Sequence, residues 1–214
     1  MITWEHPWLT AGDKLICFGD SITEAPKGYV LMLQELLASR KIEVVNAGRG
    51  GDKTPWALTR LEASVIQPKP TALSIFLGTN DACIGRRRWA DEPTVSPEVY
   101  KANLIWMIYL CRKAGIQKFS ITPPLWRLEG EPWTEQGDVL APYCLAAREA
   151  ADQTQARFVP ADVAFADEWQ RHPGHTGLLL TADGVHLNDQ GNRIVVETML
   201  KAWDVADETR TTPA

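Results

Sequence analysis

Five short apolar segments alternate with longer segments whose apolar residues recur every three or four positions. The strand-length segments are Leu15–Phe18, Glu43–Val45, Ala72–Leu77, Lys118–Thr122 and Arg157–Val159. Helical spacing is found over Tyr29–Ser39, Pro55–Ile66, Glu98–Ala114, Val139–Thr154 and Gly191–Trp203. Such alternation is typical of a parallel sheet covered by helices on both faces. We therefore predict an α/β fold, a three-layer α/β/α sandwich whose five-stranded parallel sheet has flavodoxin-like strand order.

The composition of the 214-residue chain does not change along its length. We expect a single domain over residues 1–205, followed by a flexible tail over residues 206–214. Two longer segments, Ala82–Pro97 and Pro123–Asp138, interrupt the alternation. Loops of that length in a compact domain are usually functional or mobile.

Charge and hydropathy exclude several classes of partner. The net charge is −5, which gives no electrostatic reason to expect a nucleic-acid partner. The longest apolar run, Leu104 to Cys111, is too short to cross a bilayer, and we predict no membrane partner. The N-terminus lacks the pattern of a secretory signal, which favours a cytoplasmic protein, with prior removal of a signal as the alternative.

The cysteines and histidines show no metal-binding pattern. Cys17, Cys83, Cys111 and Cys144 form no Cys-x-x-Cys pair, and most lie in segments that are predicted to be buried. We expect free thiols, and neither a metal nor another cofactor.

Reactive side chains follow the predicted strands. Ser21 comes just after the first strand, and Asn80 just after the third. Near the C-terminus, Asp183 precedes His186 by three residues, so its carboxylate can reach Nδ1 and leave Nε2 free to accept a proton. Taken alone, each of these features has an ordinary structural explanation: a serine can cap a helix, an asparagine can form a turn, and a lone Asp-x-x-His pair need not be functional. Together they supply the hydroxyl, amide donor, imidazole and carboxylate that acyl transfer requires.

A glycine-rich segment, Asn46 to Thr54, follows the second strand. Its glycines allow backbone N–H groups to approach a ligand closely. The segment lacks the order of a phosphate-binding loop, and Thr23 prevents a match to the Gly-x-Ser-x-Gly motif of α/β-hydrolases.

The ordered set of four blocks resembles the SGNH hydrolases, also called GDSL esterases/lipases. The blocks are Phe18-Gly19-Asp20-Ser21, Asn46 to Thr54, Gly78-Thr79-Asn80-Asp81 and Asp183 to Asn188. The resemblance covers roughly residues 13 to 203 and implies the same three-layer fold. It also implies ester hydrolysis through an acyl-enzyme, without a cofactor.

The resemblance assigns a role to each motif residue. Ser21 is expected to be the nucleophile, His186 the general base and then acid, and Asp183 the residue that orients His186. The oxyanion hole is expected to comprise the backbone N–H groups of Ser21 and Gly51 and the side chain of Asn80. Gly48 and Gly50 stay open as alternatives to Gly51, which we prefer because it directly precedes Asp52. Asp20 and Asp81 are expected to support the site by hydrogen bonds.

The motifs do not select the substrate, which we expect to be a small-molecule ester. The layout resembles bacterial carbohydrate acetylesterases, so our hypothesis is a short-chain, most simply acetyl, esterase that acts on an acetylated saccharide. Four tryptophans could stack on sugar rings or instead fill core or subunit contacts, which leaves a homo-oligomer open: Trp56, Trp89, Trp126 and Trp133. Alternatives are a lysophospholipase or thioesterase of the GDSL type, a non-catalytic saccharide-binding protein and a flavodoxin-like nucleotide binder.

Overall fold

The computed structural model describes residues 7–82, 93–125, 129 and 139–205. Five parallel strands form one sheet with the order β2-β1-β3-β4-β5. Their bounds are β1 Lys14–Gly19, β2 Glu43–Gly48, β3 Ala72–Phe76, β4 Lys118–Thr122 and β5 Arg157–Phe158. This order confirms the predicted flavodoxin-like α/β fold.

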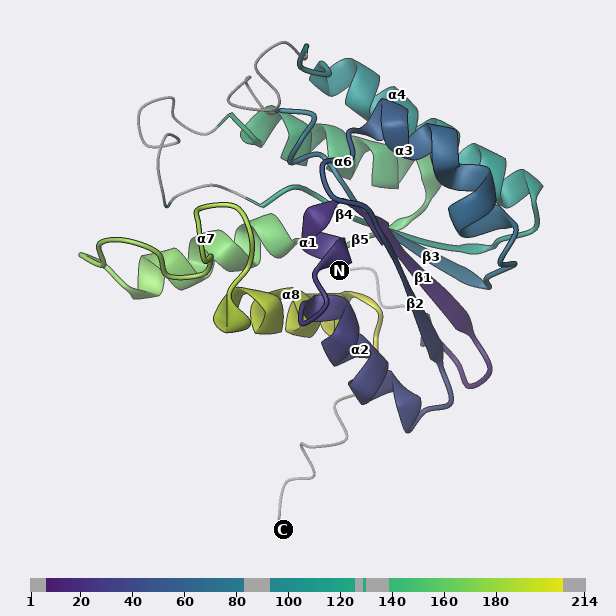
Figure 1. Cartoon of the computed structure of the whole chain (residues 1–214), viewed down its shortest axis with the longest axis horizontal. Coiled ribbons are helices and arrows are strands. Elements are labelled where there is room, and N and C mark those ends of the chain that lie inside the picture. The colour runs from purple at the N-terminus through teal and green to yellow at the C-terminus, as the bar shows by residue number, and fades with distance from the viewer. Residues whose placement is uncertain (1–6, 83–92, 126–128, 130–138, 206–214) are drawn as a thin grey trace.

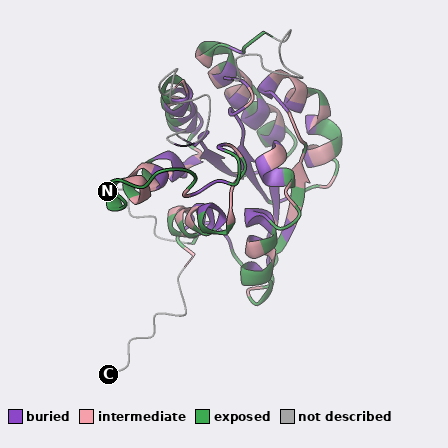
Figure 2. Cartoon of the chain, turned by 60° about the vertical axis from the view of Figure 1, so that its left-hand side comes forward, coloured by how far each residue is buried: buried purple, intermediate pink, exposed green. Residues whose placement is uncertain are grey.

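Helices cover both faces of the sheet (Figure 1). They are α1 Ser21–Glu24, α2 Tyr29–Ala38, α3 Thr54–Leu61, the π-helix η1 Glu62–Ile66, α4 Pro97–Lys113, α6 Ala141–Thr154, α7 Ala161–Arg171 and α8 Asp189–Ala202. One hydrophobic cluster joins the sheet to α3, α4 and α6, and a second joins it to α2, α7 and α8. Buried residues accordingly follow the sheet and the inner sides of the helices (Figure 2). The three-layer sandwich is confirmed.

Two helical segments differ from the sequence prediction. Helix α7 was not predicted, because half of its apolar residues are alanines and Phe165 is its one large side chain in the buried core. The helix predicted over Pro55–Ile66 begins at Thr54 and changes from α to π geometry after Leu61. Such a change of pitch leaves the three- and four-residue spacing nearly intact, so the pattern of apolar positions cannot reveal it.

Strand β2 is longer than predicted, and this matters for the site. It extends through Asn46 to Gly48, where Gly48 pairs with Gly19 of β1. The first part of the glycine-rich segment is therefore strand rather than loop. Only glycine fits at position 48, because α1 lies against the end of β2 and a Cβ at Gly48 would overlap the backbone of Glu24. The ends of β1 and β2 and helix α1 thus form one closely packed unit.

The remaining composition-based expectations concern the thiols and membrane spans. Cys17, Cys111 and Cys144 are buried thiols that form no disulfide among the described residues, as predicted, whereas Cys83 lies outside those residues. Within the described ranges, no helix is both long and apolar enough to span a membrane.

Candidate active site

Ser21 is the first residue of α1 and is separated from the end of strand β1 by one residue. The preceding residue, Asp20, caps this short helix, because its Oδ1 accepts the N–H of Ile22 at 3.0 Å. The Ser21 side chain is held at the carboxyl edge of the sheet and is half-buried. This is the edge at which ligands bind in open α/β sheets.

Asp183 and His186 lie in a compact turn between Thr181 and Leu187, which form an antiparallel bridge. The Asp183 Oδ1 atom accepts the backbone N–H groups of Val185 at 2.9 Å and His186 at 2.8 Å. Its Oδ2 atom lies 2.7 Å from His186 Nδ1. One carboxylate therefore fixes both the turn and the imidazole that projects from it.

The structure brings Ser21 and His186 together across 165 positions of sequence. The Ser21 Oγ atom lies 3.0 Å from His186 Nε2. The hydroxyl, the imidazole and the Asp183 carboxylate consequently form a continuous hydrogen-bonded series. With Nδ1 donating to Asp183, Nε2 is the nitrogen that can accept a proton from Ser21.

The pKa of Asp183 reflects this contact. Partial burial acts to raise it, but hydrogen bonds from the His186 side chain and from the backbone of His186 and Val185 outweigh burial and lower the pKa. The carboxylate is therefore ionised over the neutral range, where it can stabilise a protonated imidazole.

A buried carboxylate that the sequence reasoning missed anchors this turn. Glu129 is 4% exposed, and its oxygens accept the N–H groups of Leu179 at 2.7 Å and Leu180 at 3.0 Å. Asn188 donates through Nδ2 to the Leu179 carbonyl at 2.9 Å. The residues that lead into the Asp183–His186 turn are thus held from two sides. The sequence signal is weak, since Glu129 is one of several acidic residues in a long loop.

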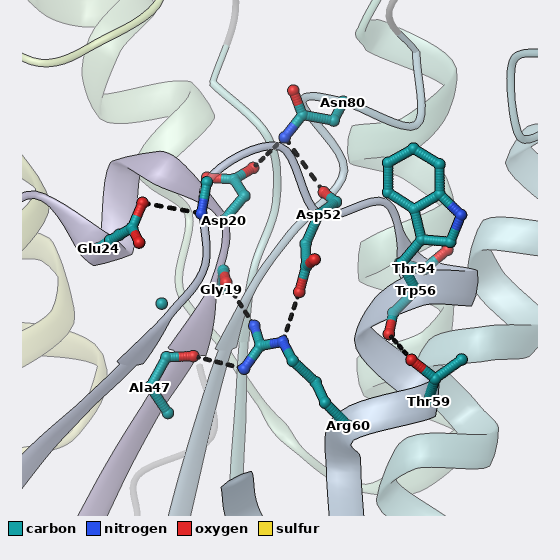
Figure 3. Close-up of polar contacts among 12 residues, drawn as sticks. Gly19, Asp20, Glu24, Ala47, Asp52, Thr54, Trp56, Thr59, Arg60 and Asn80 are labelled. Atoms are coloured by element: carbon teal, nitrogen blue, oxygen red, sulfur yellow. Dashed lines mark hydrogen bonds and ion pairs between the residues drawn. The ribbon is translucent and has the colours of Figure 1, made fainter. Parts of the chain in front are cut away.

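Asn80 follows β3 at the same edge of the sheet and points toward the loop after β2 (Figure 3). Its Nδ2 atom donates to the Asp52 carbonyl oxygen at 3.1 Å and makes a longer contact of 3.4 Å with Asp20 Oδ2. Asn80 therefore connects the residue beside Ser21 with the end of the glycine-rich segment. The longer of its two contacts is the one that a bound oxyanion can most easily replace.

The three glycines left open by the sequence differ in their hydrogen bonds. The Gly48 N–H donates to Asn46 Oδ1 at 2.9 Å, and the Gly50 N–H donates to Glu24 Oε2 at 2.8 Å. For Gly51, no atom of the described residues accepts the N–H. Gly51 also has a φ of +81°, a conformation that favours glycine. Of the three, Gly51 alone offers a donor that is not already used within the described chain.

Asp81, beside Asn80, is a structural carboxylate rather than part of the reactive series. Both of its oxygens accept the Thr54 N–H at 3.1 Å, and Oδ1 also accepts the Thr54 hydroxyl at 2.5 Å. Burial raises the pKa of Asp81 to about 6, although the hydrogen bonds from Thr54 and the charge of Lys53 act in the opposite direction. The carboxylate fixes the first turn of α3 to the loop after β3.

A small cavity of about 10 Å³ lies beside the hydrogen-bonded series of Ser21, His186 and Asp183. Its wall includes the neighbours of the motif residues, namely Ile22, Thr79 and Val185. The rest of the wall is mostly apolar and comprises Leu125, Glu129, Phe165, Trp169, Thr181, Gly184 and Leu187. Such a volume accommodates roughly one water molecule or one methyl group.

Several sequence candidates fall outside the described residues. These are the sugar-stacking candidates Trp89, Trp126 and Trp133. The fourth, Trp56, is half-buried on α3, with Lys53 Nζ 5.6 Å from its ring centre. Within the part of the chain that the structure describes, no group of three His, Cys, Asp or Glu residues could hold a metal ion.

A serine hydroxyl, an imidazole and a carboxylate in hydrogen-bonded series at the edge of a parallel sheet define a serine hydrolase site. Comparison with known proteins gives the family. The model of the GDSL-like lipase/acylhydrolase family matches residues 17–194, so the chain belongs to this family. The resemblance inferred from the four motifs is thereby confirmed, and the protein is a serine ester hydrolase.

Relatives and solved structures agree with this family. A GDSL esterase/lipase of Arabidopsis thaliana is 30% identical over 213 residues, which cover 88% of this chain and 84% of the relative. An acetylxylan esterase of Geobacillus stearothermophilus is 26% identical over an alignment that covers 89% of this chain and 94% of that esterase. The crystal structure of that acetylxylan esterase, Axe2, superposes with a TM-score of 0.76 at 25% identity, covering 91% of this chain and 95% of Axe2.

Proposed function

We propose that Ser21, His186 and Asp183 hydrolyse a short-chain acyl ester, with Ser21 as the nucleophile. The observation that carries the proposal is the hydrogen-bonded series itself, with 3.0 Å between Ser21 Oγ and His186 Nε2 and 2.7 Å between His186 Nδ1 and Asp183 Oδ2. These distances are those of direct proton transfer and of a fixed tautomer.

The reaction has two stages. Ser21 Oγ bonds to the ester carbonyl carbon while its proton passes to His186 Nε2, and the carbonyl oxygen becomes an oxyanion. The bond from carbon to the alcohol oxygen then breaks, and His186 returns the proton to the leaving alcohol. In the second stage, a water molecule gives a proton to His186 and attacks the acyl-enzyme. The acid leaves, and the proton returns to Ser21 Oγ.

Three donors are proposed to stabilise the oxyanion. They are the backbone N–H groups of Ser21 and Gly51 and the Nδ2 group of Asn80. The choice of Gly51 is supported by its unused N–H, because the N–H groups of Gly48 and Gly50 already donate to side-chain oxygens. Donors aimed at the position where charge develops are commonly the largest single contribution to such catalysis.

The small cavity supports an acetyl group as the acyl part. The cavity is lined by Ile22, which follows Ser21, and by Val185, which precedes His186, and we propose that it receives the acyl group of an ester bound to Ser21. With room for about one methyl group, it favours acetyl over longer chains. A substrate with several additional methylenes would have to displace the buried side chains of Leu125 and Phe165.

A carbohydrate is the proposed alcohol part. This step relies on the relative named acetylxylan esterase, which aligns with 89% of the chain at 26% identity. Half-buried Trp56, on the helix that follows the Gly51 loop, offers an aromatic surface to a sugar ring.

The test of the serine mechanism is the hydrolysis of p-nitrophenyl acetate. The wild-type protein is expected to turn over this ester, and Ser21→Ala is expected to lower kcat by about 10,000-fold or more. The matched control is Ser39→Ala, at the end of α2, which should keep the wild-type rate. A fluorophosphonate probe should label the wild type at Ser21 and leave Ser21→Ala unlabelled. Wild-type activity in Ser21→Ala would refute the assignment.

A panel of esters tests the substrate. Acetylated xylose oligomers and p-nitrophenyl esters of two, four and eight carbons should be compared by kcat/KM. We expect preference for acetyl over butyryl, and the highest value for an acetylated sugar. Preference for the eight-carbon ester would contradict the acetyl assignment and favour a lysophospholipase or thioesterase activity. Tight saccharide binding without turnover of any ester would instead indicate a non-catalytic binding protein.

A further inference from the structure

The side chain of Arg60 lies at the centre of a polar network that includes Gly19, Ala47 and Asp52 (Figure 3). Its Nε atom donates to Asp52 Oδ2 at 2.5 Å, and its two terminal nitrogens donate to the carbonyl oxygens of Ala47 and Gly19, each at 2.9 Å. Its guanidinium group also lies over the Phe18 ring, 4.2 Å from the ring centre. The Arg60 side chain is only 12% exposed, so these contacts are largely shielded from water.

The acceptors of Arg60 lie beside the proposed oxyanion donors. Gly19 ends β1 two residues before Ser21, and Asp52 directly follows Gly51. The backbone carbonyl of the same Asp52 accepts the Asn80 side chain. Arg60 is thus linked through Asp52 to Gly51 and Asn80, and through Gly19 and Asp20 to Ser21. No contact joins it to Ser21 Oγ or to His186 within the described chain.

Arginine is the side chain that this arrangement requires. Its rigid planar group can donate in three directions at once, whereas a lysine ammonium is a compact charge on a flexible stem. Arg60 also neutralises Asp52, whose side chain is 4% exposed. Without Arg60, Asp52 would be a buried carboxylate without its ion-pair partner, a costly state that the loop could relieve by moving.

We propose that Arg60 is a positioning residue that holds the oxyanion donors in register with the reactive serine. The inference rests on the proposed function and deepens it. Through its bond to Gly19, Arg60 fixes the end of β1. Through its bond to Asp52, Arg60 fixes both the Gly51 backbone and the direction of the Asn80 amide. Removal of Arg60 loosens the Gly51 and Asn80 donors relative to Ser21, while the Ser21–His186–Asp183 series stays in place.

The experiment compares Arg60→Ala and Arg60→Lys with the wild type on p-nitrophenyl acetate. We expect kcat to fall about 100-fold for Arg60→Ala and about 10-fold for Arg60→Lys, because oxyanion contacts act mainly in the transition state. KM should stay within about twofold, for the same reason. The pH at which activity declines on the acid side should not move, because His186 and Asp183 are untouched.

Chemical rescue and a second arginine separate positioning from stability. Added guanidinium ion, below denaturing concentration, should restore part of the kcat of Arg60→Ala in a saturable manner and should not restore His186→Ala. The control is Arg157→Ala. Arg157 is 7% exposed and binds the Ala202 carbonyl and Asp204, far from the carboxyl edge of the sheet. Arg157→Ala should lose thermal stability and keep its kcat.

The outcomes distinguish this inference from the proposed function. If Arg60→Ala does not fold, Arg60→Lys carries the test. Wild-type kcat in Arg60→Lys overturns the positioning role, as does a loss of activity that appears wholly in KM. In either case the wild type would still require Ser21. An inactive wild type, or an active Ser21→Ala variant, would instead refute the proposed function before any Arg60 variant is measured.

Discussion

The two halves of the site are held in opposite ways. The half that contains Ser21, Gly51 and Asn80 rests on the sheet edge, with the Asp52 and Arg60 side chains 4% and 12% exposed. The other half is a surface turn in which the side chains of Asp183 and His186 are 54% and 49% exposed. The first half is fixed by buried contacts among distant segments. The second depends on short contacts within one turn and on its anchor at Glu129.

Two carboxylates show what this difference does to acid–base chemistry. Burial raises the pKa of Asp81 to about 6 in the first half. In the second half, burial is partial, and hydrogen bonds from His186 and Val185 lower the pKa of Asp183. The same residue type is therefore poised to gain a proton where it is structural and to keep its charge where the proposed mechanism uses that charge. Stability and activity should consequently respond to different substitutions.

The largest separation of activity from stability is expected for Asp183→Asn. The carboxamide cannot stabilise a protonated imidazole, so kcat on p-nitrophenyl acetate should fall by about 1000-fold or more. The melting temperature should change by no more than about 2 °C, since the contact between Asp183 and His186 is exposed to solvent and exposed polar contacts contribute little to stability. Calorimetry and steady-state kinetics on the same samples test this. A large loss of stability would show that the turn is not the independent unit that its exposure indicates.

Asn80→Ala should affect both properties, because Asn80 belongs to the buried half. Loss of one oxyanion donor should lower kcat by about 100- to 1000-fold. Loss of the hydrogen bond to Asp52 should also lower the free energy of unfolding by about 1 kcal/mol. The matched control is Asn103→Ala, which removes a 3.0 Å hydrogen bond to Thr54 and should reduce stability without a comparable loss of kcat. Equal kcat values for the two variants would contradict the role of Asn80.

The smallest effect concerns the pH dependence of stability. Because Asp81 has a raised pKa, the folded protein keeps its proton between about pH 4 and 6, where the unfolded chain has lost it. This group therefore favours folding at low pH, and its contribution is lost as pH rises to about 6. The change amounts to at most about 3 kcal/mol, at about 1.4 kcal/mol per pKa unit.

Asp81→Asn should remove that slope. Denaturant unfolding at pH 4, 5, 6 and 7 measures it, with Asp183→Asn as the comparison. Since the pKa of Asp183 is lowered, its own contribution is present above about pH 4 and is lost only at more acidic pH. An unchanged slope over pH 4 to 6 in Asp81→Asn would argue against a raised pKa at this position.

Much of the fold could be predicted because apolar spacing reports directly on burial. The five strands and the helices that became α2, α4, α6 and α8 were found within a few residues of their bounds. Helix α7 was missed because it buries little apart from Phe165. The end of β2 was placed too early because Asn46 and Gly48 are typical of turns, whereas pairing with β1 keeps them in the sheet.

The candidate catalytic residues could be named from motif order, but the residues that support them could not. Ser21, Asn80 and the Asp183–His186 pair were named from the sequence, and the structure brings Ser21 and that pair into contact. The difference among the glycines depends on which N–H groups already have acceptors, which only the folded backbone defines. Arg60 was overlooked, although it falls on the buried side of α3 between Ala57 and Leu61, where a charged residue requires a buried partner.

The distance in sequence between Ser21 and His186 has a consequence for synthesis of the protein. The hydroxyl belongs to the unit formed by β1 and α1, whereas the imidazole belongs to the turn just before helix α8. On the ribosome, a nascent chain therefore holds its nucleophile long before it holds its base. In the proposed mechanism, hydrolytic activity begins only once the turn that carries Asp183 and His186 has been synthesised and has folded against the end of β1.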